Sequence, residues 1–131
     1  MTDIVLSGIH MQDVRVGNGR LVINTRGRVV VILLSEIEWL EAKGNYVRIQ
    51  AGAELHRIRG PISRVEQLLP PAFTRIHRCI IVNTEQVRLL RWCNGAEYVT
   101  VLRSGKELPV SKSYRKAVSA ALTAIADPSR P

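Results

Sequence analysis

Side chains that could contact a polyanion recur in three short stretches of this chain. Arg78 carries a planar guanidinium able to pair with O6 and N7 of guanine, and Asn45 carries an amide able to pair with adenine. We predict a base-reading set that consists of Arg78, Asn45 and Lys43. Phosphate oxygens require only a cation or a hydroxyl donor. The predicted phosphate-contacting set is Arg75, Ser111, Lys112, Tyr114, Arg115 and Lys116.

The basic charge of the chain is concentrated in one region. The 131 residues carry a formal net charge of +8, and the pI is near 10.3. Residues 73–116 hold nine basic and three acidic side chains, whereas the rest of the chain holds ten and eight. A regional excess of this kind is the electrostatic footprint that binding to a nucleic acid requires. The composition therefore favours a polyanionic partner.

Two of the base-reading residues also have ordinary structural explanations. Asn45 follows Gly44 and could serve only as a left-handed turn residue. Arg78 could instead form a salt bridge, for example with Glu41. The sequence leaves both alternatives open. His77, next to Arg78, is predicted to be a half-buried histidine with satisfied hydrogen bonds, and not a catalytic or metal-binding group.

The sequence lacks the motifs of an enzyme. It contains no glycine-rich phosphate loop, no nucleophile elbow and no cluster of metal ligands. Its two cysteines, Cys79 and Cys93, form no CxxC pair, so neither a zinc site nor a disulfide is supported. Cys79 lies beside aliphatic residues and is expected to pack as a small, inert hydrophobic group. We predict no catalytic residue, no metal and no cofactor.

The elements that must position these side chains are mostly short strands separated by turns. The β-branched run Val29–Leu33 predicts a buried strand, and Asn94-Gly95 predicts a two-residue hairpin turn. Residues 1–18 are interpreted as a lead-in or linker that could add one short strand, and residues 123–131 as a C-terminal tail. Further strands are expected at residues 37–41, 46–50, 55–59, 80–82, 87–92, 98–102 and 108–110.

Two helices are expected, and they lie far apart in the sequence. Pro61 fits the first position of one helix, which ends before Pro70. The other helix is expected to begin with Ser113 as its N-cap and to end before Asp127. Because the pattern contains no helix-turn-helix unit, loops or strand ends must make any contact with a nucleic acid.

Three longer motifs follow one another along the chain, and together they resemble a known family. They are EIEWLEAKGNYV at residues 36–47, FTRIHRCIIVN at 73–83 and LPVSKSY at 108–114. They are similar, in order and spacing, to the motifs of the LytTR (LytR/AlgR-type) DNA-binding domain family. The resemblance covers residues 19–122. Three departures stand out: Cys79 replaces a common Ser, Ile80 an aromatic residue and Lys112 an Arg, which favours a phosphate contact over a base contact at that position.

The resemblance implies both a fold and a function. The implied fold is mainly β, an elongated arrangement of small antiparallel sheets with two short helices, whose loops enter successive major grooves of double-stranded DNA. The implied function is transcription regulation in bacteria by a response regulator output domain that binds promoter direct repeats, with a second protomer on the DNA. Many members carry an upstream receiver or sensor, and this chain contains none.

A different class of function also fits the basic composition. A β-rich RNA-binding module, or a protein-interaction module with a merely solvated basic face, would carry the same charge. An RNA reader presents several aromatic side chains on one sheet, whereas aromatic residues make up only 5% of this chain. We expect a cytoplasmic location without a membrane partner, since the longest apolar run is too short to span a bilayer and no signal peptide is apparent.

Overall fold

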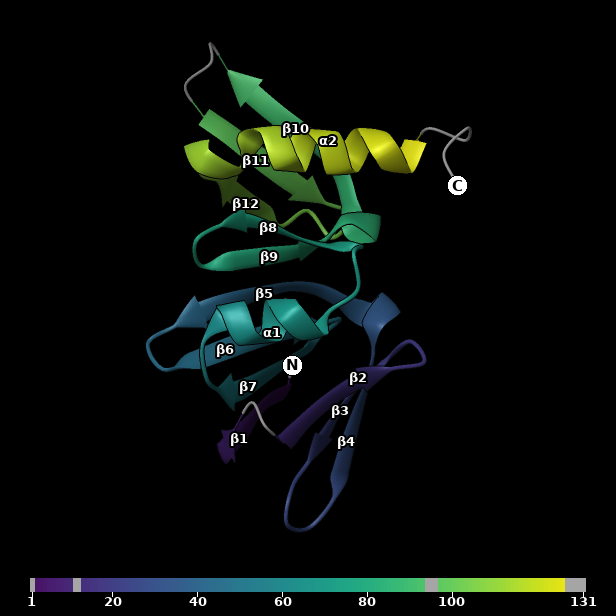
Figure 1. Cartoon of the computed structure of the whole chain (residues 1–131), viewed down its shortest axis with the longest axis vertical. Coiled ribbons are helices and arrows are strands. Elements are labelled where there is room, and N and C mark those ends of the chain that lie inside the picture. The colour runs from purple at the N-terminus through teal and green to yellow at the C-terminus, as the bar shows by residue number, and fades with distance from the viewer. Residues whose placement is uncertain (1, 11–12, 94–96, 127–131) are drawn as a thin grey trace. The chain divides into compact units, whose positions relative to one another are not determined.

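The chain divides into two compact units at the Pro70-Pro71 pair. The computed structural model describes residues 2–10, 13–93 and 97–126 (Figure 1). The first unit comprises residues 1–70 and the second residues 71–131. The length of 131 residues predicted a single domain, whereas the structure divides this length into two units. The consecutive prolines explain where the division falls, because proline continues neither a helix nor the ladder of a sheet.

Three antiparallel strands form a small sheet in the first unit. They are β2 (Val14–Gly17), β3 (Arg20–Asn24) and β4 (Val29–Leu33), with β3 in the centre. Asn18 and Gly19 connect β2 to β3 with φ angles of +51° and +73°. Two successive positive φ angles are typical of the type I′ hairpin turn, for which Asn-Gly is a favoured pair. This turn begins at Asn18, the last residue of the predicted lead-in at residues 1–18.

Strand β4 forms as predicted, but the prediction that it is buried is wrong. Val29, Val31 and Leu33 expose 58%, 52% and 41% of their surface, whereas Ile32 exposes 3%. Among the described strands, β4 is the last of its sheet, and only one of its faces packs on the core. A continuous apolar run does not distinguish a half-exposed strand from a fully buried one.

A second sheet carries most of the core of the first unit. Leu40, Ile49 and Ile58 are fully buried in it, and each contributes about 2 kcal/mol by leaving water. Residues 2–10 and 14–17 both form strands, where the sequence suggested at most one. The first unit holds four strands of this sheet, which are, in spatial order, β1 (Thr2–His10), β7 (Glu54–Arg59), β6 (Tyr46–Ala51) and β5 (Ile37–Lys43). Strand β1 runs parallel to β7, and β6 runs antiparallel to both β7 and β5.

The first predicted helix is present but begins one residue later than expected. Helix α1 spans Ile62–Leu68, and Pro61 occupies the N-cap position with the extended angles φ −79° and ψ 145°. Ile62 and Val65 are buried, as the apolar pattern predicts. Leu69 is the C-cap of the helix, and its N–H still bonds to the carbonyl oxygens of Val65 and Glu66, just before the two prolines.

The second unit consists of a hairpin and a three-stranded antiparallel sheet. The predicted pairing of residues 87–92 with 98–102 is confirmed, and Trp92 lies opposite Tyr98. The turn predicted at Asn94-Gly95 falls outside the described residues. The hairpin is formed by β8 (Phe73–His77) and β9 (Ile80–Asn83), and the sheet by β10 (Val87–Cys93), β11 (Glu97–Leu102) and β12 (Glu107–Val110).

The last helix starts differently from the prediction. A single 3-10 turn at Lys112–Tyr114 precedes helix α2, which spans Arg115–Ala126. The N-cap of this turn is Ser111 and not Ser113, and the Tyr114 N–H donates to the Ser111 carbonyl at 2.9 Å. Such an i→i+3 bond tightens the chain into a 3-10 turn, so Ser113 lies inside the turn. Val118 of α2 is buried, as its apolar pattern predicts.

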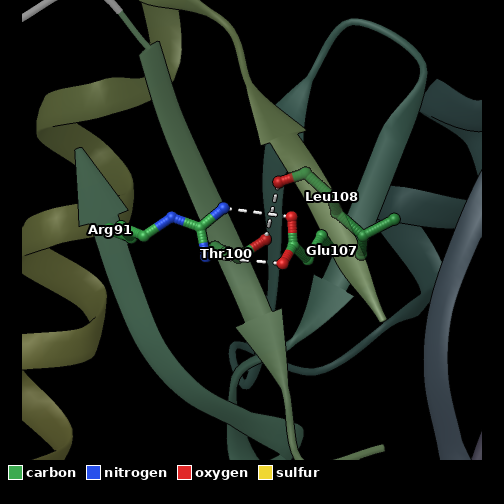
Figure 2. Close-up of polar contacts among 4 residues, drawn as sticks. All are labelled: Arg91, Thr100, Glu107 and Leu108. Atoms are coloured by element: carbon green, nitrogen blue, oxygen red, sulfur yellow. Dashed lines mark hydrogen bonds and ion pairs between the residues drawn. The ribbon is translucent and has the colours of Figure 1, made fainter. Parts of the chain in front are cut away.

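An ion pair crosses the three-stranded sheet of the second unit (Figure 2). Arg91 of β10 reaches over β11 to Glu107 of β12 with N···O distances of 3.0 and 3.4 Å. These hydrogen bonds, with the charge attraction, raise the pKa of Arg91 and lower the pKa of Glu107. Both side chains are exposed, so the contribution to stability is small. Beneath them, the buried Thr100 donates to the Leu108 carbonyl at 3.1 Å.

The predicted fold class is confirmed. Antiparallel sheets dominate, with β1 as the parallel exception. The two α-helices belong to different units. In the part of the chain that the structure describes, they therefore form no helix-turn-helix.

Candidate nucleic-acid interface

The turn between β8 and β9 presents Arg78 to solvent. Arg78 and Cys79 form the turn, and His77 pairs with Ile80 across its base. The pairing register shifts between Arg75 and His77, which marks an irregularity one step before the turn. Irregularities of this kind often redirect a side chain at the end of a hairpin. The predicted position of Arg78, at the entry to the buried strand at residues 80–82, is therefore what the structure shows.

Side chains hold this turn in place. The Arg75 guanidinium donates from Nε to the His77 carbonyl at 2.9 Å, and from Nη2 to the Arg78 carbonyl. His77 is half-buried, and its Nδ1 accepts the Cys79 N–H at 3.1 Å. The prediction of a satisfied, half-buried histidine is confirmed. Arg75, predicted as a phosphate contact, uses at least two of its donor groups to fix the two carbonyls that flank Arg78.

A distant segment of the chain lies against the same hairpin. The Ser111 N–H donates to the Ile76 carbonyl at 2.9 Å. This bond joins the end of β12 to β8, two residues before Arg78, although the two segments are far apart in sequence. Five of the six predicted phosphate contacts follow from that point, at Ser111, Lys112, Tyr114, Arg115 and Lys116. The fold thus brings this set close to the Arg78 turn.

The members of this segment are not equally available to a ligand. Lys112 and Lys116 are exposed, whereas Ser111, Tyr114 and Arg115 are half-buried. The Arg115 guanidinium carbon lies 4.3 Å from the centre of the Tyr98 ring, and Tyr98 stacks on Trp92 with 5.3 Å between ring centres. A cation over an aromatic face stabilises by about 0.5–2 kcal/mol. Arg115 therefore also fastens the start of α2 to the sheet.

The other two base-reading candidates occupy a turn of the first unit. Gly44 and Asn45 connect β5 to β6, and Lys43 pairs with Tyr46. Gly44 has the positive φ of +60°, so the left-handed residue of this turn is Gly44 and not Asn45. That finding removes the alternative in which Asn45 serves only as a left-handed residue. Lys43 and Asn45 are both exposed.

Residues that the sequence did not single out border this turn. The Gly60 N–H donates to the Asn45 carbonyl at 3.0 Å. Arg59 donates to the Tyr46 hydroxyl at 3.3 Å, with its guanidinium carbon 5.4 Å from the ring centre. A hollow of about 380 Å³ is lined by Gly44, Asn45, Arg59, Gly60 and Pro61. The only sequence signal for Arg59 is the Gly60-Pro61 turn that follows it.

The ion pairs within each unit bear on the alternative role of Arg78 as a salt-bridge residue. Glu41, its suggested partner, lies 4.0 Å from Arg48, which is directly opposite on β6. The Arg78 side chain is exposed and makes no ion pair with any described residue of the second unit. Its charge is therefore available to an external anion.

Metal-binding clusters and membrane-spanning helices are both absent from the described residues, 2–10, 13–93 and 97–126. They contain no group of three or more His, Cys, Asp or Glu side chains placed to hold a metal ion. None of their helices is long and apolar enough to cross a bilayer. The Cys93 side chain lies outside the described part, and Cys79 is a free, half-buried thiol.

Comparisons with known proteins identify relatives of this chain. The family model of the LytTr DNA-binding domain matches residues 27–123. The sensory transduction protein LytT of Bacillus subtilis is 24% identical over 107 residues, which are 80% of this chain and 44% of that protein. The transcriptional regulatory protein LytR of Staphylococcus aureus (strain MW2) is 33% identical over 63 residues, 47% of this chain and 26% of LytR.

A solved structure shares the fold. It is the LytTr DNA-binding domain of a putative methyl-accepting/DNA response regulator from Bacillus cereus, with a TM-score of 0.70 and 24% identity. The match covers 81% of this chain and 98% of that domain. The chain spans less than half the length of the curated relatives named above.

Proposed function

Because the chain belongs to the LytTr DNA-binding domain family, a family of regulator domains and not of enzymes, we propose that it reads double-stranded DNA through its turns. The observation that carries this proposal is the Arg78 turn. The Arg78 guanidinium is exposed and has no ion pair among the described residues of the second unit. Hydrogen bonds that join the side chains of Arg75 and His77 to the backbone stabilise the turn that carries it. A side chain on a fixed base can present its donors to O6 and N7 of a guanine in the major groove.

Affinity and sequence choice come from different residues in this proposal. Lys112 and Lys116, exposed and close to the Arg78 turn, supply cations to backbone phosphates. Phosphate contacts provide most of the affinity and little sequence information. Arg78, Asn45 and Lys43 supply the contacts to base edges. Asn45 has an amide that can pair with an adenine, and its exposure leaves that amide accessible.

The binding site on DNA is proposed to be a pair of direct repeats in a promoter. Two protomers would occupy it, each with its turns in successive major grooves. Named relatives are a sensory transduction protein and a transcriptional regulatory protein, both more than twice as long as the matched region. The signal would accordingly reach this domain from a receiver or sensor outside the chain. The proposed location is the bacterial cytoplasm, where the DNA partner is.

Two measurements test this function. Selection of bound sequences from a random duplex library is expected to return a recurring motif in two copies at fixed spacing. With about six phosphate contacts, the slope of log affinity against log salt should be about −5. A flat salt response, or a library without an enriched sequence, would contradict the proposal. Equal or tighter retention on single-stranded RNA of the same length would favour the RNA-binding alternative.

A further inference from the structure

A groove between helix α2 and strand β10 combines apolar walls with two cationic side chains. Its volume is about 390 Å³, which is within the range of pockets that hold small organic ligands. All of its lining residues belong to the second unit, in which Figure 1 shows α2 passing across β10. This α2–β10 groove is distinct from the Arg78 turn and from the hollow beside Asn45.

The apolar wall of the α2–β10 groove is unusually open to solvent. Trp92 exposes 57% of its surface and Leu89 exposes 40%, and both line the groove with Leu90 of β10 and Leu122 of α2. Large apolar side chains with this much exposure are costly in water and often mark binding surfaces. An apolar body inserted between α2 and β10 would cover them.

The polar wall is cationic and partly fixed in position. Arg103 donates from Nε to the Glu85 carbonyl at 3.3 Å, and its N–H donates to the Gln86 carbonyl at 2.8 Å. The Nε bond leaves the two terminal amino groups of Arg103 for another acceptor. Arg88 also lines the groove, and its guanidinium group makes no hydrogen bond or ion pair with any residue that the structure describes. Glu85 adds one carboxylate to these two cations.

An irregularity in the strand accounts for the placement of Arg88. Val87 pairs with Leu102 and Leu89 pairs with Val101, so Arg88 is an extra residue in β10 at this point. A bulge of this kind changes the direction of a side chain that regular alternation would place elsewhere. Arg88 thereby joins Leu90 and Trp92 in the lining of the groove.

We propose that the α2–β10 groove binds a small amphipathic monocarboxylate, whose carboxylate is held by Arg88 and Arg103 and whose apolar body packs on Leu90, Trp92 and Leu122. Two guanidinium groups against one Glu85 carboxylate leave a single positive charge, which matches one negative charge on the ligand. Guanidinium groups bind carboxylates through paired, charge-assisted hydrogen bonds. A volume of about 390 Å³ accommodates one small molecule.

The test is a titration of the whole ¹⁵N-labelled chain with decanoate, kept below its micelle concentration. The chain has two tryptophans, so the indole N–H signals provide an internal control. The Trp92 signal should move and saturate, whereas the signal of Trp39, which is 6% exposed in the first unit, should remain. Decanol and decyltrimethylammonium, which share the apolar chain but lack the negative charge, should bind at least about tenfold more weakly, because neither can accept the charge-assisted hydrogen bonds of the two guanidinium groups.

A matched pair of variants tests whether the arginine in the groove, and not basic charge in general, binds the carboxylate. Arg88→Gln should weaken decanoate about tenfold. Arg91→Gln, three residues along the same strand, removes an equal charge that already pairs with Glu107, and should change affinity less than about twofold. Absence of a saturable Trp92 shift, equal binding of the three probes, or equal weakening by the two variants would overturn the proposal. So would a lower salt slope for DNA in Arg88→Gln, which would make this arginine a phosphate contact.

Discussion

Two hairpin turns carry the candidate base-reading side chains, and they are held in different ways. In the β8–β9 turn, the Arg75 guanidinium and the His77 ring bond to backbone groups of the turn itself. In the β5–β6 turn, a backbone bond from the Gly60 N–H to the Asn45 carbonyl supports the turn, and the conformation depends on the positive φ of Gly44. One turn is braced by side chains and the other by its backbone.

If both turns read DNA as proposed, this difference predicts different roles for them. Discrimination between bases requires a side chain whose donors stay in place. A mobile donor can also reach the acceptors of other base pairs, which reduces the preference for one sequence. The side-chain-braced turn meets that requirement for Arg78. The β5–β6 turn can adjust its amide and ammonium groups to the DNA, at the cost of ordering them on binding. We therefore expect sharper sequence choice at the base pair that Arg78 contacts.

The largest expected effect is that of Arg78→Ala. Loss of a bidentate contact should reduce affinity for the selected operator by about 1–3 kcal/mol and affinity for random duplex much less. Quantitative binding to both duplexes, at one salt concentration, measures the two losses. Equal losses on the two duplexes would show that Arg78 only positions the protein, and base reading would then belong to the Lys43–Asn45 turn.

A smaller effect is expected from Arg75→Gln, and it separates bracing from phosphate binding. If Arg75 acts by holding the carbonyls of residues 77 and 78, operator affinity should fall by about 1–2 kcal/mol while the salt slope stays the same. Arg75→Lys should rescue little, because an ammonium cannot reproduce the two guanidinium bonds. A slope reduced by about one contact, with full rescue by Lys, would instead support the phosphate role predicted from sequence.

The residue types and spacing predicted where the candidate residues lie in the fold, but not the local bonds that these residues make. The run at residues 73–83 correctly indicated a hairpin end with Arg78 at its turn, because motif order and strand period are local properties. The bonds of Arg75 to carbonyls two and three residues away depend on the turn geometry, so charge alone suggested a phosphate contact. Similarly, the apolar run at residues 29–33 predicted a strand, but its exposure depends on which strands flank β4.

In the backbone-braced turn, we expect Asn45→Ala to cost about 1 kcal/mol in operator affinity, near the lower limit for a base contact. The backbone bond from Gly60 to the Asn45 carbonyl does not involve the side chain, so the turn should persist. Unchanged thermal unfolding and a library selection on the variant provide the check. A loss as large as that of Arg78→Ala would remove the proposed difference between the turns.

Lys112→Ala provides a reference against which both turns can be judged. Removal of one phosphate contact should weaken operator and random duplex alike, by about fivefold at 0.15 M salt, and reduce the salt slope by about one contact. Lys112 is exposed at the first position of the 3-10 turn, so its loss should not disturb the fold. A loss confined to the operator would make Lys112 a base-reading residue despite its point charge.

The smallest effect is expected from Cys79→Ser. This substitution changes a side chain in the β8–β9 turn but leaves the hydrogen bonds of Arg75 and His77 in place. The bond that matters there joins the Cys79 backbone N–H to His77 Nδ1, and a serine supplies the same N–H. The thiol is only half-buried, so a hydroxyl in its place keeps contact with water, and the cost to stability should stay below about 1 kcal/mol. Operator choice and salt slope should match the unsubstituted chain, and peroxide should affect both proteins equally. Peroxide-sensitive DNA binding that disappears in Cys79→Ser would show that oxidation of this thiol disturbs the turn, and Cys79 would then be a redox-responsive part of the reading turn.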